Sequence, residues 1–246
     1  MRSGFFATQN FRSWKKFSQS SPHFGQGQRH VTFPSQNRST RELVPIQRDT
    51  CLKCRRPQVA CYCAQLRPFD PGFDLAVLVH PREHRNPVGT ARMLHRFTQG
   101  SRVFVGTGRE LADDESFRSW LGSRTGATWV LYPDDQAEWV DTGPSAALRR
   151  PSRPAIVLLD GTWSQAKGLM RDCSLLHALP RVAFHPQMPS QYGFREQPAD
   201  LCLSSLEAVV ELCRRLGSAK EENLAPMLAA FLSMVDFQLE SERTHS

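Results

Sequence analysis

Short runs of apolar residues alternate with helical patterns from residue 73 onward. Each apolar run is short enough for a strand and leads into polar residues. Because short apolar strands that alternate with helices form buried parallel sheets, we expect an α/β fold, a mostly parallel sheet with helices on both faces. The expected strands are "DLAVLVH" (74–80), "RVFVG" (102–106), "TWVLY" (128–132), "AIVLL" (155–159) and "RVAFH" (181–185). The expected helices cover residues 87–97, 113–121, 204–217 and 223–237, and residues 133–154 are expected to be mostly loop.

The first 48 residues show no sustained hydrophobic period and are rich in Ser, Gln, Arg and Phe. We expect them to form a disordered basic arm. They hold eight Lys or Arg residues and one acid, Glu42, which accounts for the whole net charge of +7. Residues 49–246 are therefore balanced in charge, so only local basic clusters there argue for binding of nucleic acid.

The apolar runs also bear on where the protein works. None approaches the roughly 18 residues of a membrane-spanning helix, and residues 1–48 lack the continuous apolar segment of a secretory signal. We expect a cytoplasmic protein that does not contact membranes. An arm rich in Arg and Ser and nearly free of acids also resembles an organelle transit peptide. An organelle location stays open, as do a loose basic arm and a misplaced start codon.

Four cysteines lie within the thirteen residues "CLKCRRPQVACYC". Their C-x2-C-x6-C-x-C spacing suits a tetrahedral zinc ion held by Cys51, Cys54, Cys61 and Cys63, with roughly 2.3 Å between zinc and each sulfur. Four protein ligands leave no open position, so such a zinc is structural, in a small knuckle over residues 49–72. The alternative is four reduced structural cysteines, because the chain shows no sign of an oxidising compartment.

Polar clusters follow three of the expected strands. Asp160 follows the fourth strand, "HPREHR" at residues 80–85 closes the first, and Tyr192 and Arg195 come after the last. In parallel α/β sheets, ligands bind beyond the carboxyl ends of the strands, where the strand order reverses. We therefore expect these clusters to build one active-site edge.

The stretch "LLDGTWSQAKGL" carries the most specific chemistry. A carboxylate at the end of a buried strand, here Asp160, is costly to desolvate unless it has partners or a task. Gly161 allows a ligand to approach the backbone closely, Thr162 is suited to cap the following helix, and Trp163 offers a face for stacking on a base. The simpler interpretation makes Asp160 a turn residue and Trp163 a core residue.

Ser204 and Glu207 form an S-x-x-E capping box, which gives Glu207 a structural role beside any role in binding. Tyr192 and Arg195 have no such structural explanation. The chain contains neither a phosphate-binding P-loop nor a G-x-G-x-x-G motif, so chemistry on nucleoside triphosphates and dinucleotides is unsupported.

At these residues the sequence resembles the DTW-domain family of tRNA-uridine aminocarboxypropyltransferases. The matching motifs are the four-cysteine knuckle with Pro57, "HPREHRNPVGTARML", "LDGTWSQAKGL" and "QYGFREQPADLCLSSLEAV", in the family order and over roughly residues 49–237. The resemblance implies a SPOUT-like catalytic domain over residues 73–240 with a C-terminal knot. It also implies transfer of the 3-amino-3-carboxypropyl group of S-adenosylmethionine to N3 of a tRNA uridine, with release of methylthioadenosine.

The resemblance, taken with the chemistry of the reaction, assigns roles to residues. Asp160 is the expected general base, since uridine N3 must lose a proton and burial raises a carboxylate's pKa. The catalytic set is completed by Thr162 and Trp163. The expected cofactor-binding residues are His80, Thr90, Leu158, Gly161, Tyr192, Arg195, Ser205 and Glu207. The expected RNA-binding residues are Lys53, Arg55, Arg56, Arg82, Arg85, Arg92, Arg96 and Lys167, although Lys53, Arg55 and Arg56 also suit a solvated face.

Within this set, Arg195 is suited to pair with the cofactor's carboxylate, and Glu207 or Asp160 with its ammonium group. The chain departs from the family at Gly193, where a second basic residue is usual, and at Ser205, where threonine is usual. The first departure puts a phosphate or carboxylate contact in doubt, whereas the second keeps the hydroxyl.

Two other functions remain open. The first is methyl transfer to RNA from the same cofactor, and the second is RNA binding without catalysis by a zinc-knuckle protein. For the transfer to N3, access to the base implies a single-stranded or flipped uridine. The sequence leaves open whether the protein is a monomer or a homodimer.

Overall fold

The structure, a computed structural model, describes residues 49–124, 127–141, 153–192 and 202–245. The chain divides after Arg48, and the residues from Asp49 onward form one compact unit. The arm predicted over residues 1–48 and the predicted ligand Arg195 lie outside the described residues.

A parallel sheet of six strands forms the centre of this unit, in the order β2-β1-β5-β3-β6-β4. This confirms the α/β fold and the parallel sheet. Strand β2 lies on one side of β1, and all later strands lie on the other side, with β5 next to β1. The strand order therefore reverses between β1 and β5. The strands are β1 (Asp74–Val79), β2 (Arg102–Val105), β3 (Thr128–Leu131), β4 (Ala137–Trp139), β5 (Ala155–Asp160) and β6 (Arg181–Ala183).

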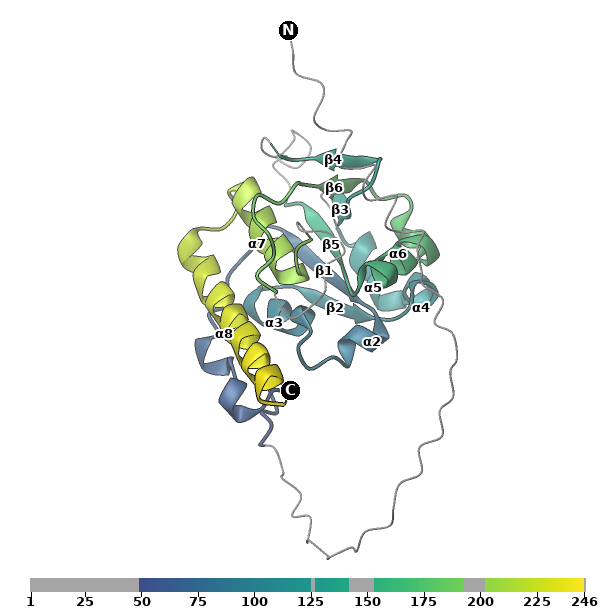
Figure 1. The fold of residues 1–246 in the computed structure, drawn as a ribbon. Helices are drawn as coiled ribbons and strands as arrows, with labels where there is room; N and C mark the ends of the chain where they lie inside the picture. Colours follow the sequence, from purple (N-terminus) through teal and green to yellow (C-terminus); the bar gives the residue numbers. More distant parts are fainter. Residues whose placement is uncertain (1–48, 125–126, 142–152, 193–201, 246) are drawn as a thin grey trace, which may run out of the picture. The chain divides into compact units, whose positions relative to one another are not determined.

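Alternation of side chains along the strands divides the hydrophobic core into two layers. On β1, Leu75, Val77 and Val79 belong to one cluster, and Ala76 and Leu78 belong to the other. The first layer is covered by α3 (Thr90–Phe97), α7 (Ser205–Leu216) and α8 (Glu221–His245). The second is covered by α4 (Gly108–Asp113), α5 (Glu115–Gly122) and α6 (Trp163–Asp172). Helices therefore lie on both faces of the sheet, as expected (Figure 1).

Three short elements were not expected from the sequence. They are α2 (Pro81–His84), α4 and β4, of which β4 lies inside the stretch predicted to be mostly loop. Helix α4 carries a capping box between Thr107 and Glu110, a signal that the T-x-x-E pattern offers in the sequence. The apolar pattern of α2 and β4 is too short to distinguish them from loop.

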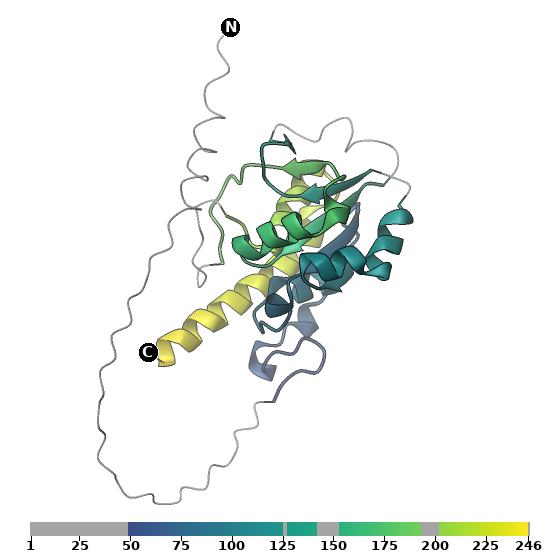
Figure 2. The ribbon, with the colours of Figure 1, turned by 90° about the vertical axis from the view of Figure 1, so that its right-hand side faces the viewer.

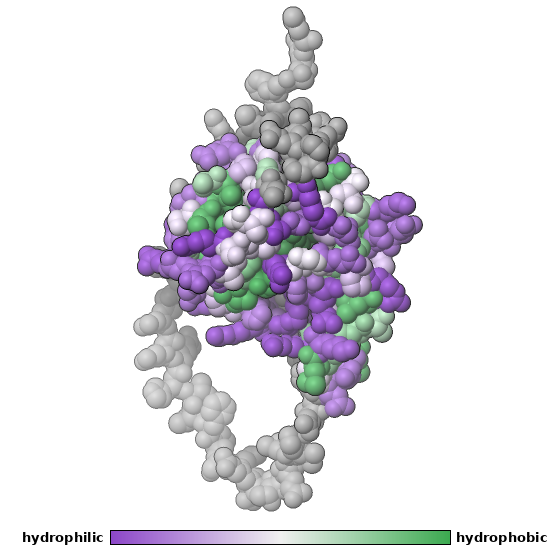
Figure 3. Space-filling model, turned by 180° about the vertical axis from the view of Figure 1, so that it is seen from behind, coloured by the Kyte–Doolittle hydropathy of each residue, from purple (hydrophilic) through white to green (hydrophobic). Residues whose placement is uncertain are grey.

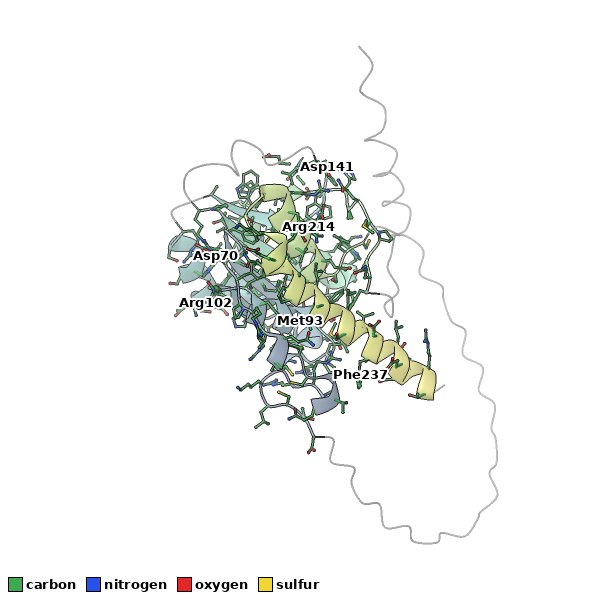
Figure 4. The ribbon with its side chains drawn as sticks, turned by 90° about the vertical axis from the view of Figure 1, so that its left-hand side faces the viewer. Asp70, Met93, Arg102, Asp141, Arg214 and Phe237 are labelled. Atoms are coloured by element: carbon green, nitrogen blue, oxygen red, sulfur yellow. The ribbon has the colours of Figure 1, made fainter. Side chains whose placement is uncertain are left out.

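Helix α8 joins the knuckle to the rest of the unit. Its apolar stripe, including Leu224, Met227 and Phe231, is buried, as its spacing predicts. In Figure 4, α8 runs across the front with Met93 of α3 behind it, and Phe237 lies towards its C-terminal end. The helix also contacts the knuckle. The knuckle contains two single-turn helices, η1 (Gln58–Ala60) and η2 (Cys63–Gln65), and a third, η3 (Ser174–Leu176), follows α6.

The knuckle also packs on α3. Tyr62 stacks on Phe97 with ring centroids 6.3 Å apart. The backbone of Phe69 forms hydrogen bonds with the backbones of Phe97 and Gln99. Cys51, Cys54 and Tyr62 belong to the same hydrophobic cluster as the core residues of α3 and α8. The knuckle therefore has no core of its own and shares the core of the sheet domain. Figure 2 shows the knuckle as the dark blue segment that follows the grey N-terminal trace.

The face of the molecule in Figure 3 is largely hydrophilic, with small hydrophobic patches between polar side chains. Over the described residues, no helix is both long and apolar enough to span a membrane. The connection from β6 to α7 includes residues 193–201, which lie outside the described residues. The predicted C-terminal knot therefore stays a prediction.

Candidate active site and metal centre

The carboxyl ends of β2, β1 and β5 lie side by side. The His80 N–H donates to the backbone oxygen of Asp160 at 3.1 Å, and the Gly106 N–H donates to that of Val79 at 3.1 Å. Val79 and Asp160 are also partners in the register of β1 and β5. This edge lies where the strand order reverses, which is the usual place for a ligand in an open α/β sheet.

Asp160 is the last residue of β5 and is only 3% exposed. The hydroxyl of Thr90 donates to its Oδ1 at 3.4 Å. Thr90 begins α3, so the carboxylate lies against the start of that helix. Leu158, two residues earlier on β5, is buried in the core layer shared by α3, α7 and α8. The predicted base is therefore a desolvated carboxylate held between a strand end and a helix start.

The residues after Asp160 form a tight turn into α6. Thr162 caps this helix, and a capping box joins it to Gln165, as predicted for Thr162. Gly161 makes this possible, because a Cβ there would lie 2.7 Å from the Gln165 Oε1 that accepts from the Thr162 N–H. Trp163 is half-buried and belongs to neither hydrophobic cluster of the described residues, which speaks against the alternative that it is a core residue.

The loop after β1 is held by its own polar side chains. His80 caps α2, its Nδ1 accepting from the Arg82 N–H at 3.3 Å. The buried Glu83 accepts from the Asn86 side chain at 3.1 Å, and Asn86 in turn accepts from the Val88 N–H. Glu83 belongs to the polar cluster predicted at residues 80–85, but neither it nor Asn86 was predicted to have a role of its own. Together they position the residues that lead into α3.

The segment after β6 is tied to the start of α7 by Glu207. Its carboxylate accepts from the Ser190 hydroxyl at 2.6 Å, the Gln191 N–H at 2.7 Å and the Ser204 N–H at 2.9 Å. The predicted capping box between Ser204 and Glu207 is confirmed. Ser205 is the first residue of α7 and is half-buried. Glu207 therefore orients the backbone around Tyr192, whatever it also contacts in a ligand.

Tyr192 links three parts of the unit. Its side chain is 3% exposed, its hydroxyl donates to the Val88 oxygen at 2.6 Å, and its ring stacks on Phe231 at 5.5 Å. The loops after β1 and β6 are thus joined beside the sheet edge. Tyr192 bonds to Val88, and Thr90, two residues further along the chain, bonds to Asp160; both were predicted to bind the cofactor.

The four knuckle cysteines gather their sulfur atoms as a metal site requires. All four sulfurs lie within 4.8 Å of one another, with 3.8 Å between Cys51 and Cys63 and 3.7 Å between Cys54 and Cys61. Two sulfurs bound to one tetrahedral ion at about 2.3 Å lie about 3.8 Å apart. The arrangement is therefore suited to bind a tetrahedral metal ion.

The buried Arg56 provides a second, independent indication of this metal site. Its side chain is 3% exposed, and within the described part of the chain its Nε and Nη1 have no hydrogen-bond partner. Burial lowers its pKa, and the acidic groups that oppose this are Tyr62, Cys54 and Tyr192. A buried guanidinium is costly unless an opposite charge compensates it. Four thiolates around a divalent metal ion carry a net negative charge. This charge would compensate the buried guanidinium of Arg56, which lies near Cys54.

The other predicted RNA-binding residues lie in three places. Lys53, Arg55, Arg92 and Arg96 gather between the knuckle and α3. Arg82 and Arg85 are exposed at α2, and Lys167 is exposed on α6. Arg56 differs from all of these because it is buried, so its guanidinium does not face solvent where a phosphate would bind.

Comparison with known proteins identifies relatives of this chain. The DTW domain model matches residues 48–239. The curated protein named tRNA-uridine aminocarboxypropyltransferase 2 of Mus musculus is 30% identical over 200 residues, covering 79% of this chain and 65% of that protein. The Drosophila melanogaster protein of the same name is 29% identical over 204 residues, covering 80% of this chain and 78% of that protein.

The Macaca fascicularis protein of the same name is 29% identical over 200 residues. The chain thus spans just under two thirds, 65%, of the length of the mouse and macaque relatives. No solved structure matches the chain. The family match covers the knuckle, the loop after β1, the turn after β5 and α7. The chain therefore belongs to the DTW domain family.

Proposed function

We propose that this protein transfers the 3-amino-3-carboxypropyl group of S-adenosylmethionine to N3 of a uridine in tRNA and releases methylthioadenosine. The names of the relatives support the reaction class. The observation that carries the proposal is Asp160, a 3% exposed carboxylate at the carboxyl end of β5, where the strand order reverses. A carboxylate in this place suits a reaction whose nucleophile must first lose a proton.

The chemistry requires one proton transfer and one displacement. Asp160 takes the proton from uridine N3, whose lone pair then attacks the side-chain methylene next to the sulfonium. The bond between this carbon and sulfur breaks, and its electron pair leaves on methylthioadenosine. General-base catalysis of this kind contributes roughly 10² to 10⁴ in rate. Attack on the methylene instead of the methyl group is decided by the position of the cofactor.

The remaining site residues hold the two reactants. We assign Thr162 and Trp163 to the target base, since they follow Asp160 at the surface of the turn into α6. We assign the cofactor to the segments around Gly161 and Tyr192, in a SPOUT-like knotted C-terminal region. The remaining predicted cofactor contacts, also part of this proposal, are His80, Thr90, Leu158, Arg195, Ser205 and Glu207.

We further propose that the metal of the knuckle is zinc. Four cysteine ligands are typical of a structural zinc site without an open coordination position. When bound, zinc would supply structure to the knuckle and no chemistry to the transfer. The expected cytoplasmic location belongs to the same proposal, since tRNA is present there.

Product analysis tests the function. Purified protein is incubated with tRNA and S-adenosylmethionine, and both the nucleosides and the cofactor products are identified by mass spectrometry. The proposal predicts an aminocarboxypropyl uridine and an equal amount of methylthioadenosine. S-adenosylhomocysteine with a methylated nucleoside would show a methyltransferase instead. Binding of tRNA without either product would show the non-catalytic alternative.

A further inference from the structure

A pocket of about 300 Å³ opens between the knuckle and the sheet edge. The knuckle contributes Lys53 and Arg55, α3 contributes Arg92 and Arg96, and Asp160 lines the pocket from β5. The pocket therefore brings the predicted base together with four cations that come from two separate elements. Its volume is at the small end of ligand sites, which suits part of a nucleic acid strand and not a duplex.

Two of the cations are held in place by backbone oxygens. The Arg92 guanidinium donates to the His84 oxygen at 3.2 Å, and the Arg96 guanidinium donates to the Lys53 oxygen at 3.3 Å. Each of these contacts uses one of the five N–H groups of a guanidinium. The Nε of Arg96 is buried without a hydrogen-bond partner among the residues that the structure describes. Both side chains are thus oriented and still have donors for an anion.

The start of α3 adds to the positive character of the pocket. Gly89 occupies the N-cap position and supplies no side-chain cap, and both Gly89 and Ala91 line the pocket. The first N–H groups of a helix, together with its dipole, favour a bound anion. The acids that line the pocket are Glu83, which accepts from Asn86, and Asp160, which accepts from Thr90.

The pKa values of two histidines reflect the positive charge around the pocket. Burial, and then the charges of Arg92 and Arg55, lower the pKa of His84. Burial, and then the charges of Arg96 and Arg102, lower the pKa of His95. Both histidines line the pocket. Burial disfavours a charge of either sign, so only the contributions of the arginines indicate the positive field that favours an anion.

We propose that this pocket binds the phosphodiester next to the target uridine and so holds the base's N3 at Asp160. The inference rests on the proposed function and names the part of the RNA that the site recognises. An RNA phosphate fits better than the carboxylate of the cofactor, because a single carboxylate is satisfied by one bidentate arginine. Four cations from two elements suit a strand that passes between the knuckle and α3.

A consequence is that the knuckle forms one wall of the substrate site. The bond between Arg96 and the backbone oxygen of Lys53 couples the metal-binding loop to α3. Loss of the metal should then weaken RNA binding without any change on the sheet itself.

Binding measurements with Arg55→Gln and Arg92→Gln test this proposal, with Arg109→Gln as the matched control. Arg109 is exposed on α4, on the other face of the sheet. The affinity for tRNA is measured from low to high salt, and the affinity for S-adenosylmethionine is measured separately. Circular dichroism and metal content establish that each variant is folded.

The proposal predicts that each pocket variant lowers the magnitude of the log–log salt slope by about 0.7 to 0.9, the value for one lost phosphate contact, with cofactor affinity unchanged within about twofold. Slopes equal to that of Arg109→Gln would overturn it. A loss of cofactor affinity with tRNA affinity intact would also overturn it and would assign the pocket to the cofactor's carboxylate.

Neutral methylphosphonate linkages, introduced one at a time into the RNA, locate the phosphate. One linkage next to the modified uridine should weaken binding as much as Arg92→Gln, and the two changes combined should cost no more than either alone. Full additivity at every linkage would contradict the proposal. These readouts measure binding, so they stand apart from product analysis: a wild-type protein that binds in this way but yields no aminocarboxypropyl uridine would refute the proposed function alone.

Discussion

The knuckle and the sheet share one core layer but differ in what else stabilises them. All six residues of β5 are buried, whereas the knuckle exposes Leu52 at 94% and Val59 at 84%. The sheet domain folds around apolar side chains on two faces, and the knuckle gathers four sulfurs and a buried cation, Arg56. Metal removal should therefore damage the knuckle, and core truncation should damage the sheet domain. The two regions meet at the cationic pocket, which Asp160 lines.

Cys54→Ser should have the largest effect of any single substitution in the knuckle. Cys54 is 1% exposed, and binding free energies of structural zinc in small peptides are about 10 to 16 kcal/mol at neutral pH. We expect the metal content to fall from one ion per chain to near zero, with an ordered sheet domain remaining. Elemental analysis and amide hydrogen exchange measure both parts.

Cys173→Ser is the matched control for this experiment, because Cys173 is buried in the other core layer and far from the knuckle in sequence. It should keep the metal. If Cys54→Ser also kept a full equivalent of metal, or if its sheet amides lost protection together with those of the knuckle, the contrast between the two regions would be wrong.

Phe231→Ala should destabilise the sheet domain. Phe231 is fully buried and stacks on Tyr192, and truncation of a buried Phe to Ala typically costs about 3 to 5 kcal/mol. Chemical denaturation should show this loss in the free energy of unfolding. The folded fraction should still bind one metal ion, so a parallel loss of metal under native conditions would argue against separate stabilisation.

Arg56→Met should lower the metal affinity and raise the stability of the metal-free protein. Removal of the buried guanidinium should lower metal affinity by roughly 10- to 100-fold, which is usual for a residue that supports metal ligands from outside the coordination sphere. The metal-free protein should become more stable, because it no longer buries an unpaired cation. Competition with a chelator gives the affinity, and exposed Arg67→Met is the control. Unchanged metal affinity would refute the role of Arg56 as a counter-ion.

The smallest effect concerns the two histidines that line the pocket. Since their folded-state pKa values lie below the ordinary value of about 6.5, the folded state binds fewer protons than the unfolded state. The free energy of unfolding should therefore decrease as the pH falls from about 6.5 towards these lower values.

Titration followed by NMR separates the two sites. Arg92→Gln should raise the pKa of His84 and leave that of His95 nearly unchanged, and Arg96→Gln should do the reverse. Equal shifts of both histidines in either variant would show a general charge effect instead of a local one.

Much of the fold was predictable because its signals are local. The five expected strands are all present, and the capping signals at Thr162 and Ser204 place the starts of α6 and α7 correctly. Successive side chains of β1 point to opposite faces of the sheet. Because helices cover both faces, the side chains from Leu75 to Val79 are all apolar and the alternation is not visible in the sequence. Strand β4 was missed because three residues pair with β6 only through tertiary structure.

The site was predictable in its parts and not in its arrangement. The order of residues suggested Asp160 and the four cysteines, yet nothing in the spacing indicated that Arg56 turns inward while Arg55 faces the pocket. The buried Arg56 interacts electrostatically with Tyr62 and Tyr192, which are distant from each other in sequence and are brought near it only by the tertiary structure. Two of the three hydrogen bonds accepted by Glu207, those from Ser190 and Gln191, likewise require the loop after β6 to fold back onto α7.

The single-turnover rate of Asp160→Asn tests the central claim most directly. The substitution keeps the size of the side chain and removes its basicity. We predict a 10²- to 10⁴-fold slower transfer, an affinity for S-adenosylmethionine within about tenfold of the wild-type value, and near-normal thermal unfolding. A folded Asp160→Asn protein that modifies tRNA at close to the wild-type rate would contradict the assignment of Asp160 as the base.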